Sequence, residues 1–133
     1  MATDVAPLTR DRLAALPDSY FKAVDAMDVD AILSHFDDDA TLTVQTDHMT
    51  FSGADEIRRM FVDFVGNSVS IFHEIKNIVV EPEAGKVATE QSYIGELRDG
   101  TRNDMHNCNF FDVNPQGKFT RVIIWMAGTN PLK

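Results

Sequence analysis

Four strand-like runs fill the second half of the chain and constrain its fold more than any other feature. They cover residues 69–81, 86–97, 103–113 and 118–127, and are rich in alternating or β-branched apolar residues. Turn sequences separate them, and Asp99-Gly100 is a strong β-hairpin pattern. Because strands joined by short turns pair antiparallel, we expect an antiparallel meander.

Three amphipathic segments precede these strands and predict helices. The first spans about residues 10–27 and repeats apolar residues at helical spacing: Leu13, Leu16, Tyr20, Val24 and Met27. The second follows an N-cap at Asp28 and carries on one side Val29, Ile32, Leu33 and Phe36. The third starts at Ser52 and Asp55, which have capping-box spacing. Helices followed by strands predict an α+β domain with about three helices on one face of a sheet.

An acidic run and a short strand-like segment lie between the second and third helices. Asp37, Asp38 and Asp39 predict a solvated turn, because a metal site would need further ligands nearby. The residues "ATLTV" that follow predict a strand.

Length and composition are those of one ordinary domain. The 133 residues are 44% hydrophobic and 25% charged, so we expect a single domain over residues 1–133, with residues 1–9 as a loose arm. The net charge of −9 predicts neither a nucleic-acid nor a membrane partner, because the Lys and Arg residues do not cluster. A lone Cys108 and the lack of an apolar leader favour a cytoplasmic protein.

The last predicted strand, residues 118–127, is apolar on both faces. Strict alternation gives two apolar sets: Phe119, Ile123 and Trp125 on one face, and Val122, Ile124 and Met126 on the other. A sheet with helices on one face normally exposes its other face to water. The second apolar face therefore predicts a homodimer through the outer face of the sheet.

His73 lies in the run 69–81, where alternation places it on one face with Ile71, Ile75, Asn77 and Val79. An imidazole between two isoleucines has two interpretations. It can be a core histidine bonded to a backbone carbonyl, or it can face a pocket and carry chemistry. The strand alone favours the first interpretation.

Other polar residues that a curved sheet could bring near His73 are scattered along the chain: Tyr20, Asp25, Gln91, Tyr93, Asn107 and Asn109. The helical wheel places Asp25 at the edge of the apolar arc, within reach of a strand if the first helix crosses the sheet. His106 and Cys108 have an i, i+2 spacing that metal sites use, but two ligands fall short of a zinc site, so we expect no metal. We expect His35 to be solvated and His48 to lie in a loop.

A resemblance to a known family rests on three phrases of the chain. These are "YFKAVDAMDVDAILSHFDDDATL", "FSGADEIRRMF" and "NFFDVNPQGKFTRVIIWMA". They resemble the first two helices with the first strand, the third helix, and the closing hairpin of the nuclear transport factor 2-like superfamily, in its SnoaL-like branch. The resemblance covers nearly the whole chain and implies a cone, in which a curved sheet wraps on helices around an apolar pocket.

Residue by residue, the resemblance implies a catalytic pair. Relatives such as scytalone dehydratase and hexachlorocyclohexane dehydrochlorinase pair an Asp late in the first helix with a His after the third, where Asp25 and His73 fall. Ketosteroid isomerase is less similar, because its strand aspartate base would fall near Val44. The fold alone identifies no reaction, since the superfamily also includes non-catalytic proteins.

The function implied is a cofactor-independent lyase, isomerase or cyclase that removes a proton from a small, largely apolar carbonyl or hydroxyl compound. His73 would be the general base and Asp25 its partner. Substrate would be bound by Tyr20, Tyr93, Asn107, Asn109, Val122, Ile124 and Met126. Two alternatives stay open: a non-catalytic small-molecule-binding protein of the same fold, and a scaffold that binds a protein through its sheet.

Overall fold

The structure, a computed structural model, describes residues 8–132. Its helices are α1 (Arg10–Asp25), α2 (Val29–Leu33) and α3 (Ala54–Gly66), with a short 3-10 helix η1 (Gln45–Asp47). Its strands are β1 (Phe36–Val44), β2 (Met49–Ser52), β3 (Ser68–Glu81), β4 (Lys86–Leu97), β5 (Arg102–Val113) and β6 (Phe119–Trp125). Most of the expected N-terminal arm, residues 1–7, lies outside the described residues. Thr9 caps α1, accepting a hydrogen bond from the Arg12 amide at 3.1 Å.

The strands form one sheet in the order β2-β1-β6-β5-β4-β3. β3 to β6 make the expected antiparallel meander, and Gly100, with φ of +91°, lies in the turn between β4 and β5. β1 differs, because it pairs parallel with β6 and places Leu42 opposite Val122. The sheet is therefore mixed, since a local sequence pattern defines a strand but not its distant partner.

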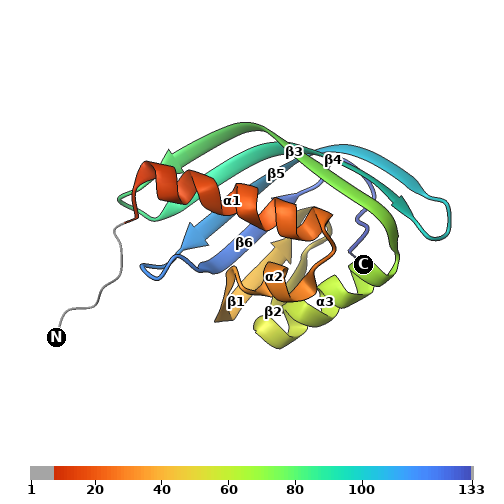
Figure 1. The fold of residues 1–133 in the computed structure, drawn as a ribbon, viewed down its shortest axis with the longest axis horizontal. Helices are drawn as coiled ribbons and strands as arrows, with labels where there is room; N and C mark the ends of the chain where they lie inside the picture. Colours follow the sequence, from red (N-terminus) through yellow and green to blue (C-terminus); the bar gives the residue numbers. More distant parts are fainter. Residues whose placement is uncertain (1–7, 133) are drawn as a thin grey trace.

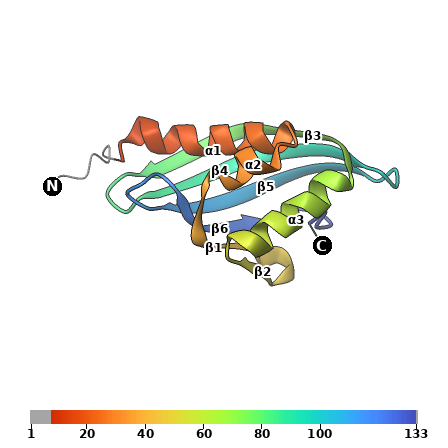
Figure 2. The same cartoon turned by 60° about the horizontal axis from the view of Figure 1, so that its bottom comes forward.

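The three helices lie on one face of the sheet, which curves around them (Figures 1 and 2). α1 packs mainly against β3, and α3 packs against β1 and β2. The core fills the space between these layers. At its centre the Tyr20 ring makes edge contacts, at centroid distances from 5.6 to 6.3 Å, with Phe36, Phe61, Phe111 and Phe119.

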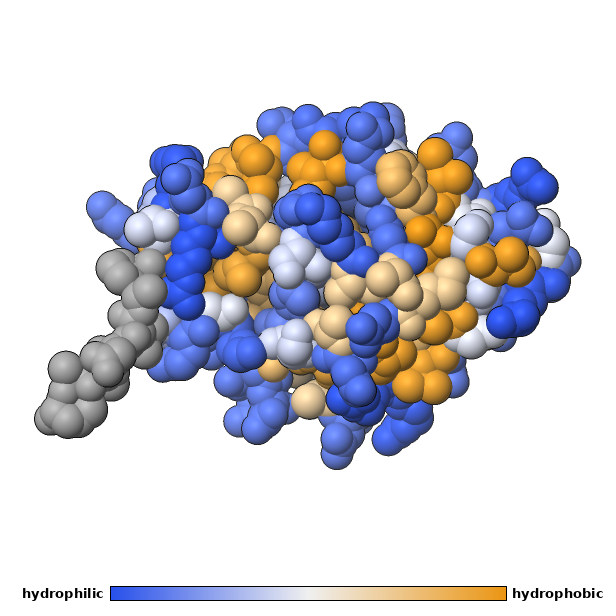
Figure 3. Space-filling view, in the orientation of Figure 1, coloured by the Kyte–Doolittle hydropathy of each residue, from blue (hydrophilic) through white to orange (hydrophobic). Residues whose placement is uncertain are grey.

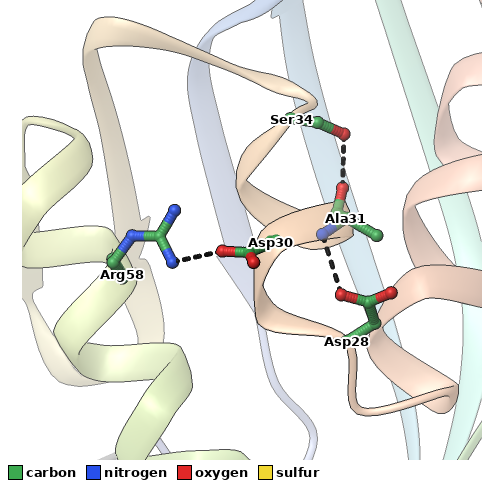
Figure 4. A network of polar contacts seen from close by, with 5 residues as sticks. All are labelled: Asp28, Asp30, Ala31, Ser34 and Arg58. Carbon is green, nitrogen blue, oxygen red and sulfur yellow. Dashed lines mark hydrogen bonds and ion pairs between the residues drawn. The ribbon is translucent and has the colours of Figure 1, made fainter.

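A short capped helix fixes the chain immediately after α1. The predicted N-cap Asp28 accepts a hydrogen bond from Ala31 N at 3.1 Å, and the Ser34 hydroxyl donates to Ala31 O at 2.6 Å (Figure 4). Arg58 of α3 pairs with Asp30 at 2.8 Å (Figure 4), although this exposed pair contributes little stability. The caps orient α2 and so limit where the end of α1, with Asp25, can lie.

Two extra residues in the strands reverse the predicted alternation. In β3 the register shifts between Ile75 and Asn77, so Val79, predicted to face inward with His73, is 63% exposed. In β6 the register shifts next to Phe119, which is fully buried rather than on the outer face with Trp125. A β-bulge adds one residue without a partner and moves every later side chain to the opposite face.

Two further local predictions were wrong. The acidic run Asp37 to Asp39 is not a turn but part of β1, which starts at Phe36 instead of after the run. Helix α3 begins one residue later than predicted, with Gly53 as N-cap at a φ of +87° that favours glycine. The Ser52 amide donates to Glu56 Oε1 at 2.8 Å, so Glu56 takes the role predicted for Asp55.

Candidate active site

A cavity of about 40 Å³ lies between α1, α3 and the concave face of the sheet. Eight aromatic or aliphatic side chains line it together with four polar ones, and Pro131 and Leu132 of the C-terminal segment complete it. The lining residues are Tyr20, Phe21, Val24, Phe61, Phe64, His73, Gln91, Tyr93, Asn107, Asn109, Ile124, Met126, Pro131 and Leu132. Six of the seven predicted substrate-binding residues are among them.

The seventh, Val122, is fully buried on the inner side of β6 and does not line the cavity. Ile124, two residues further along the strand, does so. Alternation correctly places both side chains on one face. It does not indicate where along that face the packed core ends and the cavity begins, because that depends on which helix residues lie above each position.

Asp25 and His73 are joined by two hydrogen bonds. Asp25 Oδ1 lies 2.7 Å from His73 Nδ1, and Asp25 Oδ2 accepts from the His73 backbone amide at 2.9 Å. Their side chains are 21% and 11% exposed. An ionised carboxylate only accepts hydrogen bonds, so Nδ1 carries a proton, and in the neutral imidazole Nε2 then keeps its lone pair. No described residue forms a hydrogen bond with Nε2.

Asp25 can form two hydrogen bonds with His73 because β3 lies at the edge of the sheet. β3 is an edge strand of the sheet, so some of its amides have no neighbouring strand to bond. His73 lies opposite Tyr93 of β4, and its amide points instead to the last residue of α1. The carboxylate therefore satisfies an edge amide and orients the ring of the same residue.

Two aromatic rings stack on the His73 imidazole. Phe21 of α1 lies at a centroid distance of 4.7 Å with planes 22° apart, and Tyr93 lies at 5.2 Å and 28°. Such stacked contacts restrict the rotation of the His73 ring. Together with Asp25, they hold the imidazole in one orientation.

Gly95 allows Tyr93 to lie flat over β4. A Cβ atom at position 95 would be 2.4 Å from the Tyr93 hydroxyl oxygen and 2.7 Å from its Cζ. The Tyr93 hydroxyl is buried and makes no hydrogen bond of good geometry with any described residue. Burial raises the pKa of Tyr93, so its phenol stays protonated at neutral pH.

A chain of side-chain amides crosses the opposite part of the cavity. Thr89 Oγ1 donates to Gln91 Oε1 at 2.6 Å, and Gln91 Nε2 donates to Asn109 Oδ1 at 3.0 Å. Asn107 Oδ1 accepts from the Ala127 amide at 3.1 Å. Because their oxygens are engaged, Asn107 and Asn109 keep their NH₂ groups as donors at the cavity wall.

Tyr20 is 3% exposed and lines the cavity within the aromatic cluster. Burial strongly raises the pKa of Tyr20, so the phenol stays protonated at any cellular pH. Its hydroxyl is therefore a further donor at the cavity and cannot act as a base.

The other predicted polar residues lie away from this cavity. His35 is half-buried, not solvated as predicted, and His48 ends η1 with a left-handed φ of 54°. His106 and Cys108 lie on the outer face, where burial and the Glu90 carboxylate raise the pKa of the thiol. Within residues 8–132, no group of three or more His, Cys, Asp or Glu side chains is placed to hold a metal ion.

Sequence reasoning missed three kinds of residue in this site. No sequence pattern distinguishes Phe21 from other apolar helix residues, and only the structure shows its ring stacked on His73. Gly95 is inconspicuous, although a glycine inside a strand often marks close approach of another group. Pro131 and Leu132 follow the last strand, and no local pattern predicts that they return to the cavity.

The chain belongs to the SnoaL-like family, because the model of the SnoaL-like domain matches residues 18–122. The structure has the α+β cone fold of that family. No curated protein gives a significant match to the sequence. No helix within residues 8–132 is long and apolar enough to cross a membrane.

Several solved structures are similar to the whole chain. A proposed aromatic ring hydroxylase from Novosphingobium aromaticivorans shares 26% identity with a TM-score of 0.81, covering 92% of this chain and 96% of that one. SalBIII, an epoxide hydrolase/cyclase-like enzyme of pyran ring formation in salinomycin, shares 20% identity with a TM-score of 0.81, covering 90% and 94%. AusH from Aspergillus nidulans shares 18% with a TM-score of 0.81, covering 95% and 92%. The two less identical structures show the fold alone.

Proposed function

We propose that the protein is a cofactor-independent lyase, isomerase or cyclase that removes a proton from a small, largely apolar carbonyl or hydroxyl compound. The observation that carries this proposal is the 2.7 Å contact between Asp25 and His73 Nδ1, which leaves Nε2 as an acceptor in an apolar cavity. The SnoaL-like family, to which the chain belongs, supports the same reaction class.

His73 is the general base in this proposal. Its Nε2 takes a proton from the carbon next to a carbonyl group, and the electron pair of that C–H bond moves onto the carbonyl oxygen as an enolate. The resulting imidazolium is stabilised by the Asp25 carboxylate and by the rings of Phe21 and Tyr93. General-base catalysis of this kind contributes a rate factor of about 10²–10⁴.

The NH₂ groups of Asn107 and Asn109, and the Tyr20 hydroxyl, donate hydrogen bonds to the oxygen that gains charge. The enolate then has three outcomes. Return of the proton to a different carbon gives isomerisation, loss of a leaving group from the β-carbon gives elimination, and attack on a second carbonyl gives an aldol ring closure. Each outcome conserves the electron pair and needs no oxidant.

Deuterium exchange tests the step that these three outcomes share. Small ketones are incubated with the protein in D₂O, and deuterium at the α-carbon is measured by mass spectrometry. We expect enzyme-dependent exchange that His73→Ala abolishes. His106→Ala, which removes an exposed histidine from the outer face, is the matched control and should exchange at the parent rate. Exchange that survives His73→Ala, or that is absent from the parent across the ketone panel, would contradict the proposal.

We also propose that a second copy of the chain covers the outer face of the sheet. Phe72, Val79, Ile94, Phe110 and Trp125 are each about half exposed or more there. Three of them line a groove of about 420 Å³ whose rim carries both charge signs, with Asp112 2.9 Å from Lys86. A two-fold contact brings the same patch of each copy together, so apolar centres and opposite rim charges can meet.

Sedimentation equilibrium at micromolar concentration tests this arrangement. We expect a dimer for the parent and a monomer for Phe110→Asp, because a charge at the centre of the patch would be desolvated. Val62→Asp is the control, since Val62 is 50% exposed on α3 and away from the sheet face. A monomeric parent would contradict the proposal.

A further inference from the structure

We infer that residues 130–132 form a movable wall of the cavity, and that the groove behind this wall is a second part of the substrate site. The inference rests on the proposed function, because it concerns how a substrate reaches His73. It assigns the groove to the apolar end of an elongated, uncharged molecule whose carbonyl end lies beside His73.

The cavity beside His73 does not hold such a molecule as it stands. It measures about 40 Å³, and a buried water occupies about 10–15 Å³ on this measure, so there is space for about three waters. Pockets for drug-sized ligands measure about 300–1,000 Å³. A wall of the cavity must move before an elongated molecule can enter.

A groove of about 210 Å³ lies on the other side of the C-terminal segment. It shares three lining residues with the cavity: Phe64, Pro131 and Leu132. Phe64 is a buried residue of α3, whereas Pro131 and Leu132 are half-buried and border both spaces. Displacing these two side chains would join the groove to the cavity.

The C-terminal segment is also the wall that is bonded least firmly. Residues 128–132 form no backbone–backbone hydrogen bond with another described residue. The Asn130 side chain accepts from Leu132 N at 2.8 Å, within the segment, and its Nδ2 reaches only the Met49 sulfur, at 3.7 Å. The other walls belong to helices and paired strands. Segments with few hydrogen bonds open at the lowest free-energy cost.

The lining of the groove decides which molecule it suits. Its apolar part consists of Met49, Phe51, Met60 and Phe64. Its polar rim carries the carboxylates of Glu56 and Asp63 but only one guanidinium, that of Arg59. The rim is therefore net negative and disfavours an anionic ligand. Figure 3 shows apolar surface beside α3 and the C-terminal segment. An uncharged apolar chain or ring therefore fits this groove best.

Prodan, an uncharged and elongated naphthyl ketone, is a suitable probe because its fluorescence reports an apolar environment. The parent, Leu132→Ala and Leu132→Trp are titrated by equilibrium and stopped-flow fluorescence. We expect Leu132→Ala to bind prodan faster and more tightly. We expect Leu132→Trp to bind about tenfold more weakly, because its larger side chain fills the passage. Shifts of the His73 imidazole NMR signals identify prodan in the cavity.

Leu8→Trp is the control, since Leu8 is also a half-buried leucine but packs near Gly85, outside the cavity lining. It should bind prodan like the parent. Equal affinities and rates in the parent and Leu132→Ala would overturn the inference, as would prodan binding that leaves the His73 signals unchanged. Prodan binding requires no turnover. If it depends on Leu132 while deuterium exchange survives His73→Ala, the proposed function fails and the movable wall stands.

Discussion

His73 and His35 form similar local structures at two places in the molecule. Both are half-buried, and both have Nδ1 within 2.8 Å of an oxygen, from Asp25 for His73 and from the Ala31 carbonyl for His35. Both rings also stack on a phenylalanine, Phe21 at 4.7 Å and Phe119 at 6.0 Å.

The two histidines differ in what surrounds the remaining nitrogen. His35 Nε2 lies 2.8 Å from Ser19 Oγ, which donates its proton to it because Nδ1 already donates to a carbonyl. His73 Nε2 has no hydrogen-bond partner among the described residues, and His73 lines the cavity. In addition, the partner of His73 is a carboxylate, whereas that of His35 is neutral. A histidine becomes a usable base when one nitrogen is held by a charge and the other is free to receive a proton.

The largest difference between the two sites should appear in the exchange rate. Asp25→Asn removes the negative charge that stabilises the imidazolium, so we expect deuterium exchange to fall by a factor of about 10²–10⁴. Ser19→Ala removes the partner of His35 and should leave exchange within about twofold, as for an ordinary surface change. Parent-level exchange by Asp25→Asn would remove the distinction between the two histidines.

Substitutions of Asp25 and Ser19, the side-chain partners of His73 and His35, should also differ in how much they lower the free energy of unfolding. Asp25→Ala leaves the His73 amide and Nδ1 without an acceptor, and we expect a loss of about 1–3 kcal/mol in the free energy of unfolding. Ser19→Ala loses one exposed hydrogen bond and should cost about 1 kcal/mol or less. Urea unfolding measures both. Equal losses would show that Asp25 has no special role in holding β3.

The aromatic contacts of His73 can be tested through Gly95. Gly95→Ala places a Cβ against the Tyr93 phenol, and we expect it to cost about 1–3 kcal/mol and to shift the His73 imidazole NMR signals. In a Tyr93→Ala background the same change should cost much less, because the clash is gone. Gly66→Ala is the control, since no atom lies within 4 Å of its added Cβ. If the stability losses of Gly95→Ala and Tyr93→Ala were additive, position 95 would not contact the Tyr93 ring.

The smallest effect concerns Tyr20, whose ring contacts His35 and lines the cavity with His73. Burial raises its pKa above the ordinary value of about 10. Above about pH 10 the unfolded chain ionises this phenol while the folded chain keeps it protonated, so stability present below that pH is lost as the pH rises. Tyr20→Phe should reduce this alkaline loss in urea unfolding at a series of pH values. If the free energy of unfolding of Tyr20→Phe fell with pH as steeply as that of the parent, the buried Tyr20 phenol would not be the cause of the alkaline loss.

Much of the fold follows from patterns that local physics determines. The third amphipathic helix and the Asp99-Gly100 turn depend on neighbours within a few residues. Both form where the sequence predicts them, although α3 starts one residue later. The extension of β1 through Asp37 to Asp39 was missed because these residues lie in an irregular stretch between Phe36 and Thr41, which both pair with the distant strand β6. The reversed faces of Val79 and Phe119 were missed because a bulge depends on the partner strand.

In the candidate site, too, some features could be predicted from the sequence and others could not. Strand parity and the position of Asp25 at the edge of the helix stripe were compatible with a contact between the two side chains, and the family resemblance paired them. They lie 2.7 Å apart. The alternation holds from Ile71 to Ile75, and so for His73, because this stretch lies between the two register shifts of β3, at Ser68/Ser70 and Ile75/Asn77. The roles of Gly95 and Leu132 required coordinates, because each depends on a contact between segments that no periodicity relates.

Chemical rescue of His73→Ala tests the central claim most directly. Deuterium exchange into a small ketone is measured for His73→Ala and His35→Ala, with and without added imidazole. We predict that His35→Ala exchanges at the parent rate, that His73→Ala does not exchange, and that added imidazole restores part of its activity with a saturable dependence. If His73→Ala exchanges at the parent rate, or His35→Ala loses as much activity as His73→Ala, then His73 is not the base.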